Sequence, residues 1–329
     1  MYILDYLKAF AIIAVVITHC DFVGAQRSHV IFPYLIGMAV PVFMLITGFN
    51  YANSCVNKKI ATLFEQYNLK LISKRLLRIV IPFAFVFFLE YFLISGMKYQ
   101  KLATVFINGG YGPGSYYFPV MLQVVLFLPL VYFVIKKFAT KGLFFVFFLE
   151  FLYFLLCAKF DINLTTYRIL SFRYLSLLGC GLYFGLYKNN VDKNILQFVF
   201  LFGLFFLTLI NYTNFDMCCY PYLKNLWNGA SGIVVSAYIA PIFYLCCSTF
   251  EKFKLSNKLH NILSIVGKSS WHIFLFQMLY YTCFSKYFTT YSLMLNILIN
   301  LFICLIFGCI FCKLETKYVT KKLVKLFNL

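Results

Sequence analysis

Long apolar runs separated by short polar connections make up nearly all of this 329-residue chain. A helix needs about 20 mostly apolar residues to cross the hydrocarbon core of a bilayer. Ten windows meet that requirement, at about 3–24, 34–54, 76–96, 117–135, 142–158, 169–187, 194–213, 229–250, 262–284 and 291–312. The connections leave no room for a second soluble domain. The pattern predicts an all-α membrane bundle of about ten transmembrane helices, forming one domain over residues 1–329.

The basic residues are distributed unevenly between the two sides of this bundle. When the connections alternate, 21 of the 29 Lys and Arg residues lie on the side of the N-terminus. Because cytoplasmic connections carry the excess of Lys and Arg, both termini are predicted to be cytoplasmic. The first apolar run has no basic cluster before it and no small-residue cleavage site after it. We interpret it as a retained span and not as a removed signal peptide.

The composition excludes the soluble classes. The chain is 63% hydrophobic and only 12% charged, whereas soluble domains are about a quarter charged. The net charge of +19 could suggest a nucleic-acid partner. The Lys and Arg residues, however, lie between apolar stretches, as they do in membrane proteins. We therefore expect this protein to contact membrane lipids and no nucleic acid. The twelve cysteines are scattered through apolar segments and predict neither a disulfide framework nor a metal site.

Two polar residues of the first apolar run need an explanation. Lys8 lies near its cytoplasmic boundary, and His19 lies beyond its middle. Eleven residues of α-helix return to within about 20° of the same face and rise roughly 16 Å, so the two side chains share one stripe. Ionisable residues inside a span are costly and indicate a functional site by default. The alternative is a snorkelling lysine and a histidine satisfied at the outer interface.

Further ionisable residues fall at the ends or in the middle of other spans. Arg75 and Arg78 stand one turn apart where the third span begins, and such a pair can bind an anion or anchor the helix in the cytoplasm. Glu90 and Glu150 fall deep in the third and fifth spans, where a carboxyl group is protonated, paired or facing a polar cavity. Either is a candidate partner for His19.

Several signatures are missing from the sequence. It contains no G-x-x-x-x-G-K-[ST], no G-x-S-x-G and no H-E-x-x-H motif, so the usual marks of ATP-driven pumps, serine hydrolases and zinc proteases are absent. No clear inverted repeat indicates a secondary transporter.

Five segments carry a resemblance to the membrane acyltransferase family 3. "LDYLKAFAIIAVVITH" is similar to the family's opening L-D-x-L-R-G-x-A-…-H, and "VPVFMLITGFNYANS" to its second-span F-F-x-x-S-G-F. "KRLLRIVIPF", "YYFPVMLQVVLFLPLVYF" and "IVGKSSWHIFLFQMLYY" resemble its later strings in the same order. Each string is loose alone, but five in order on ten spans make a fairly specific match over nearly the whole chain.

The departures from the family pattern are also informative. Lys8 replaces the usual Arg, which keeps the charge but loses bidentate geometry. Thr47 replaces Ser in S-G-F and keeps a hydroxyl, while Tyr117 stands where Trp is common. Gln277 replaces a late His, which removes a titrating group and leaves hydrogen bonding.

The resemblance implies a mechanism and a location. Acetyl-CoA, or another acyl-CoA, would be the cytoplasmic cosubstrate, with Lys8, Arg75 and Arg78 binding the donor, and no permanently bound cofactor is implied. His19 would act as general base on a hydroxyl of a cell-surface or lipid-linked glycan, since imidazole titrates at roughly pH 6.5; an acyl-imidazole relay is the other role. The implied location is a bacterial-type inner membrane, with the protein crossing several times.

Other residues receive supporting roles in this scheme. Thr47, Glu90, Glu150 and Gln277 are possible supports, with Thr47 and Gln277 as oxyanion donors. The outward connection 97–116 contains "NGGYGPGSYY", a flexible and irregular sequence. Its Tyr116 and Tyr117, with Arg173 on the sixth span, are candidates for the acceptor side; interface anchoring is their alternative. The competing function is a transporter or flippase for a lipid-linked glycan.

Overall fold

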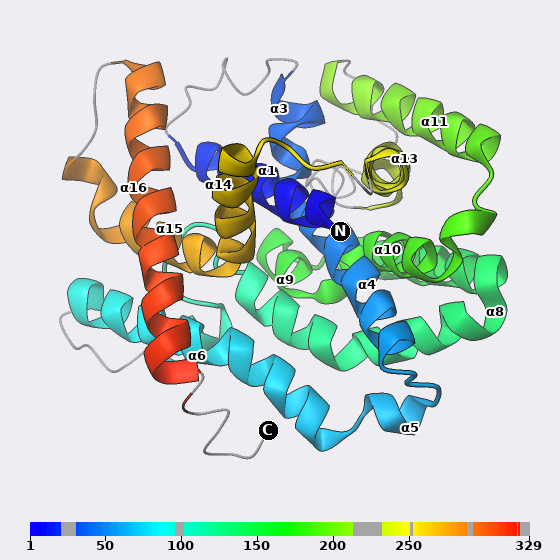
Figure 1. Ribbon diagram of the computed structural model, residues 1–329, viewed down its shortest axis with the longest axis horizontal. Helices are drawn as coiled ribbons and strands as arrows, with labels where there is room; N and C mark the ends of the chain where they lie inside the picture. Colours follow the sequence, from blue (N-terminus) through cyan, green and yellow to red (C-terminus); the bar gives the residue numbers. More distant parts are fainter. Residues whose placement is uncertain are drawn as a thin grey trace. The chain divides into compact units, whose positions relative to one another are not determined.

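The computed structural model describes residues 1–20, 31–95, 102–212, 232–250, 253–287, 292–320 and 322. These residues form helices and no strand, which confirms the predicted all-α class (Figure 1). The helices are α1 (Tyr2–Thr18), α3 (Ile31–Tyr34), α4 (Ala39–Asn57), α5 (Leu63–Gln66), α6 (Leu69–Ser95), α7 (Leu102–Ile107), α8 (Tyr117–Lys159), α9 (Leu164–Ile169), α10 (Leu175–Tyr187), α11 (Lys193–Tyr212), α13 (Ile233–Thr249), α14 (Asn257–Lys268), α15 (Ser270–Cys283) and α16 (Leu293–Glu315).

The chain divides into two compact units, each assembled from segments that are far apart in the sequence. Unit 1 comprises Met1–Leu4, Ser28–Gln66 and Leu126–Phe253, and unit 2 comprises Asp5–Arg27, Tyr67–Val125 and Lys254–Leu329. In unit 1, α10 packs against α4 and α13, and α11 packs against α13. In unit 2, α15 packs against α16 and α6. The single domain over residues 1–329 stays a prediction.

Several of these helices are long and apolar enough to cross a membrane. In the described part of the chain, five candidate spans meet both conditions, namely Phe32–Asn57, Leu63–Ile94, Tyr117–Lys159, Lys193–Tyr212 and Leu293–Thr320. A sixth arises if the bent pair α14 and α15 counts as one span, and α13 is apolar but shorter. A multi-pass membrane protein is therefore supported, while the count of ten and the cytoplasmic termini stay predictions.

Helix α8 contains two of the predicted spans. A straight helix of 43 residues would be about 65 Å long, twice the thickness of the hydrocarbon core. The helix is broken at Ala139, whose φ of 46° and ψ of −120° are not helical. Beyond the break, a Cβ on Gly142 would lie 2.6 Å from the carbonyl oxygen of Val134, so the chain turns back sharply here. The two arms match the predicted windows 117–135 and 142–158.

The predicted window 262–284 is not one continuous helix. It is divided at Ser269 into α14 and α15, which meet at 65°. Next to the bend, α14 packs closely against α1: a Cβ on Gly267 of α14 would lie 2.1 Å from the backbone oxygen of Asp5 on α1. The bend directs α15 towards α6 and α16, which it contacts.

Glycines allow α4 and α10 to approach each other closely in unit 1. A Cβ on Gly48 would lie 2.3 Å from the carbonyl oxygen of Leu178, and one on Gly181 would lie 2.2 Å from that of Leu45. Such contacts between small residues are a main source of helix association in membranes. Gly48, which follows Thr47 in the second-span string, therefore has a packing role.

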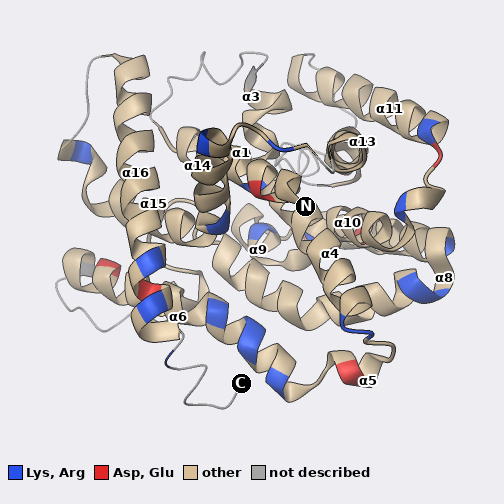
Figure 2. Ribbon diagram, viewed as in Figure 1, with Lys and Arg blue, Asp and Glu red and all other residues tan. Residues whose placement is uncertain are grey.

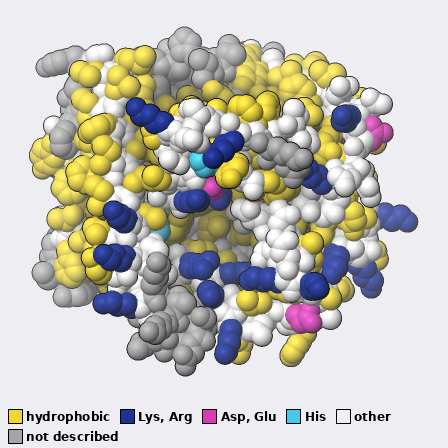
Figure 3. Space-filling model, in the orientation of Figure 1, with side chains coloured by type: hydrophobic (Ala, Val, Ile, Leu, Met, Phe, Trp, Pro, Cys, Tyr) yellow, Lys and Arg dark blue, Asp and Glu magenta, His cyan; other side chains and the backbone are white. Residues whose placement is uncertain are grey.

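The exposed side chains of α16 suit the hydrocarbon core of a membrane, and those at the start of α6 suit the membrane–water interface. Exposed hydrophobic side chains follow α16 along its whole length, among them Leu298, Phe302 and Ile310 (Figure 3). Basic residues instead mark the first half of α6, from Lys70 to Arg78 (Figure 2). Basic residues at one end of an apolar helix are typical of a membrane interface.

Candidate active site

His19 lies in a turn just after the first helix. Helix α1 ends at Thr18, and the His19 amide N–H donates to the carbonyl oxygen of Val16 at 3.2 Å. The prediction of a helix running to residue 24 placed His19 inside that helix, and this placement is wrong. That Lys8 and His19 share one face stays a prediction.

Side chains of α15 hold this turn in place. The Tyr281 hydroxyl donates to the Val16 carbonyl at 3.0 Å and lies 3.3 Å from the Cys20 sulfur. The rings of His19 and Tyr281 meet edge to face with centroids 6.1 Å apart. Tyr281 thus ties the end of α1 to α15 at the residues on either side of His19.

Two asparagines of α16 extend this network. Asn300 donates to the Cys20 sulfur at 3.6 Å and to Asn296 Oδ1 at 3.1 Å, and it accepts a hydrogen bond of 2.7 Å from Tyr280. Buried amides need such partners because an unpaired polar group in an apolar interior is costly. Neither asparagine was predicted to belong to the site, although two asparagines four apart in an apolar span were a visible signal.

Residues 109–116, which follow α7, form a glycine-rich segment. This segment packs tightly against α15. Gly109 and Gly112 are buried, and a Cβ on Gly112 would lie 2.5 Å from the Cβ of Met278. Gly109 has a φ of +89° and would meet the Ser115 oxygen at 2.0 Å. The segment is irregular, as predicted, and its glycines serve close packing and left-handed backbone conformations.

Two fully buried side chains from different helices bind the backbone of this segment. Glu90 Oε2 accepts a hydrogen bond of 3.2 Å from the Tyr111 N–H, and Gln277 Nε2 donates to the Pro113 oxygen at 3.5 Å. The remaining oxygens, Glu90 Oε1 and Gln277 Oε1, have no hydrogen-bond partner among the described residues. Burial raises the pKa of the Tyr111 hydroxyl, with smaller contributions from Tyr91 and Glu90, so this hydroxyl stays protonated at neutral pH.

Gly114 brings the segment to the imidazole. It has a φ of +81°, and a Cβ there would lie 3.5 Å from His19 Nε2 and 3.2 Å from the Phe274 ring. Because glycine has no side chain, the space beside Nε2 is not filled from this position. His19, the glycine-rich segment and α15 thus meet at one place in unit 2.

Aromatic side chains border this place. Tyr117 is buried, and its ring lies 5.2 Å from that of Phe274 and 6.1 Å from that of Trp271. Tyr116 is half-buried. The Tyr117 ring packs against neighbouring aromatics, which supports a structural contribution; the acceptor role of both tyrosines stays a prediction.

The three predicted donor-binding cations also belong to unit 2. Lys8 Nζ lies 3.5 Å from Asp5 Oδ1, and the Ser264 hydroxyl donates to Asp5 Oδ2 at 3.4 Å. Arg75 is half-buried and Arg78 is exposed, one turn apart on α6. Lys8 is partly exposed, so its ammonium group can exchange Asp5 for another anion.

The other predicted residues lie in unit 1. The Thr47 hydroxyl donates to the Phe43 carbonyl at 2.8 Å, which occupies its single proton. Glu150 is buried, and its Oε2 accepts a hydrogen bond of 2.6 Å from the Ser176 N–H.

Arg173 is also buried in unit 1. Its guanidinium lies 4.7 Å from the centroid of the Tyr174 ring. A cation over the face of an aromatic ring is attracted by the ring quadrupole. These contacts account for Glu150 and Arg173 within their own unit, and their predicted roles remain untested.

The comparisons with known proteins identify the family. A family model described as an acyltransferase domain matches residues 1–314. The chain belongs to the membrane acyltransferase family 3. No curated protein and no solved structure matched the chain. The protein is therefore a membrane acyltransferase, and the resemblance seen in the five sequence strings is confirmed.

Proposed function

We propose that this acyltransferase moves an acetyl group from cytoplasmic acetyl-CoA to a hydroxyl of a cell-surface or lipid-linked glycan, in a bacterial-type inner membrane. The observation that carries the proposal is His19, which lies in the turn after α1 with Nε2 facing the glycine-rich segment. A histidine held by neighbours on both sides, within an acyltransferase domain, fits a general base.

The proposed step balances as follows. His19 Nε2 takes the proton of the acceptor hydroxyl while the oxygen of that hydroxyl attacks the thioester carbonyl carbon. The new C–O bond forms, the C–S bond breaks, and the departing CoA thiolate receives the proton from the imidazolium. The acyl-imidazole relay is the alternative order, in which Nε2 itself attacks the carbonyl.

The polar residues around the segment support this step indirectly. Glu90 and Gln277 hold its backbone, so they would keep Gly114 beside the imidazole. Gln277 also remains the better oxyanion candidate, because its amide has a second N–H besides the one donated to Pro113, whereas the single Thr47 proton is donated to Phe43. A donor fixed in place before the reaction stabilises developing charge most effectively.

Release of CoA tests the proposed reaction directly. Protein purified in detergent should release free CoA from acetyl-CoA when a glycan acceptor is added, and the acceptor should gain an acetyl group. We would measure CoA with a thiol reagent and the acceptor by mass spectrometry. Transport of a lipid-linked glycan without any CoA release would reject acyl transfer and favour a flippase.

Lys8 provides a test of donor binding. We expect Lys8→Gln to raise the KM for acetyl-CoA about tenfold with little change in kcat, because a lost charge contact weakens binding by about 1–2 kcal/mol. Lys8→Arg should stay close to the parent enzyme, since it keeps the charge. An unchanged KM in Lys8→Gln would assign Lys8 to its contact with Asp5 alone.

A further inference from the structure

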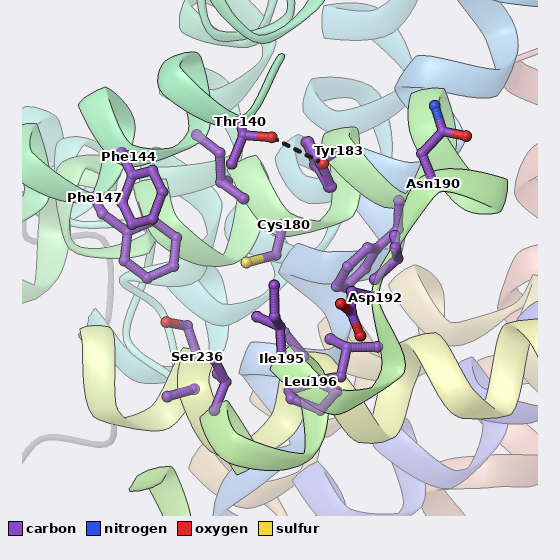
Figure 4. A pocket seen from close by; sticks show the side chains of 17 residues that line it. Thr140, Phe144, Phe147, Cys180, Tyr183, Asn190, Asp192, Ile195, Leu196 and Ser236 are labelled. Atoms are coloured by element: carbon purple, nitrogen blue, oxygen red, sulfur yellow. Dashed lines mark hydrogen bonds between the residues drawn. The ribbon is translucent and has the colours of Figure 1, made fainter.

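Unit 1 contains a cavity of about 330 Å³ that the proposed reaction does not use. It is bounded by the second arm of α8, by α10, by the N-terminal half of α11 and by α13 (Figure 4). Ligand pockets have volumes of about 300–1,000 Å³.

The cavity is apolar along most of its wall and polar at one side. The rings of Phe144 and Phe147 lie on one side, where Ser236 is the polar neighbour, whereas Tyr183, Asn190 and Asp192 lie on the other, where Ile195 and Leu196 also line the wall (Figure 4). The Tyr183 hydroxyl lies 3.2 Å from that of Thr140, which closes part of the polar side. This division matches a molecule that has a hydrocarbon chain and a polar head.

The surroundings of the polar side favour an anionic head. Lys141 follows Thr140, and Lys188 and Lys193 lie on either side of Asn190 and Asp192 in the sequence. Asp192 is the one acidic residue in the cavity wall, and its Oδ1 accepts a hydrogen bond of 2.8 Å from the Asn194 N–H. In the sequence, three lysines thus neighbour the polar residues of the wall, and the one carboxylate already caps α11.

Two apolar residues of the cavity wall are exposed at the surface. Phe144 is 71% exposed and Ile195 is 62% exposed, and both line the cavity. They belong to α8 and α11, which are two of the candidate spans. In a bilayer, lipid hydrocarbon chains surround such residues. Contact of the apolar wall with these chains is more favourable than contact with water.

We infer that this cavity binds one chain of an anionic phospholipid, with the head group at the side of Lys141, Lys188 and Lys193. The lipid is neither donor nor acceptor in this inference, so the site is independent of the proposed reaction. Its contribution is to fill the space between four helices of unit 1 and so to stabilise them.

The test compares two tryptophan variants of the same helix. Ile195 and Leu201 are 62% and 60% exposed on α11, but only Ile195 lines the cavity. Native mass spectrometry of the purified protein with phosphatidylglycerol should show one retained lipid. Ile195→Trp should weaken that binding at least tenfold, and Leu201→Trp should change it less than twofold, with both variants keeping CoA release.

The head group is tested by charge. Phosphatidylglycerol should bind at least tenfold more tightly than phosphatidylcholine with the same chains. The double variant that carries Lys141→Gln and Lys193→Gln should lose most of that preference. Lys159→Gln, at the other end of α8, should keep it. Equal binding in the two tryptophan variants, or equal binding of the two lipids, would overturn the inference. Displacement of the lipid by palmitoyl-CoA, with a matching change in transfer, would also overturn it by assigning the cavity to the donor.

Discussion

His19→Ala should lower the rate of acyl transfer by at least about 100-fold, because general base catalysis contributes about 10²–10⁴ to a rate. The substitution removes Nε2 from the place beside Gly114. It leaves the hydrogen bonds of Tyr281 and Asn300, which join the neighbouring residues Val16 and Cys20. Release of CoA at saturating acetyl-CoA and acceptor is the measurement, so that a fall reports the chemical step.

A second histidine of unit 2 supplies the control. His260 Nδ1 lies 2.8 Å from the Tyr6 hydroxyl, and its ring packs against that of Tyr6. We expect His260→Ala to reduce stability slightly and to leave transfer within a few-fold of the parent. If His19→Ala retained full activity while showing the same elution profile and melting temperature, His19 could not be the base.

Gly181→Ala should destabilise unit 1 more than any other single methyl addition to α10. The new Cβ would lie 2.2 Å from the Leu45 carbonyl oxygen and 3.0 Å from the Phe49 nitrogen, so the backbones of α4 and α10 must separate. Overpacking costs about 1–3 kcal/mol, and we expect the melting temperature in detergent to fall by roughly 5 °C or more.

The matched control lies two residues earlier on the same helix. A Cβ on Gly179 would meet only side-chain atoms, the nearest being Val146 Cγ1 at 3.1 Å. Those side chains can shift, and alanine gains up to about 1 kcal/mol in helix propensity, so Gly179→Ala should leave the melting temperature nearly unchanged. Equal melting temperatures for the two variants would contradict the close approach of α4 and α10.

Much of the helical content follows from local sequence properties. Apolar length predicted the helices within windows 34–54, 76–96, 194–213 and 291–312, and the structure contains α4, α6, α11 and α16 there. The end of α1 at Thr18 and the bend at Ser269 were not predicted, because windows chosen for apolar length extend across both breaks and include the polar residues there, such as His19, Lys268 and Ser269.

The candidate site was only partly visible in the sequence. His19 and Gln277 were found from their residue types and from the family strings, but neither pattern shows what surrounds them. Met278 and Phe274 pack on the glycines of the segment 109–116, and Tyr281 holds the turn at His19. Ordinary apolar and aromatic residues carry no signal of such roles, since they occur throughout the spans.

The sequence by itself determined that this chain is an α-helical membrane acyltransferase, since apolar length and short motifs are local properties of neighbouring residues. Only the tertiary structure decided that Gly114 faces His19, that Glu90 and Gln277 bind one backbone segment, and that four helices of unit 1 enclose a cavity. The physical reason is that these contacts join residues far apart in the chain. Their distances depend on how closely helices pack, and packing is set by all the side chains at each contact together.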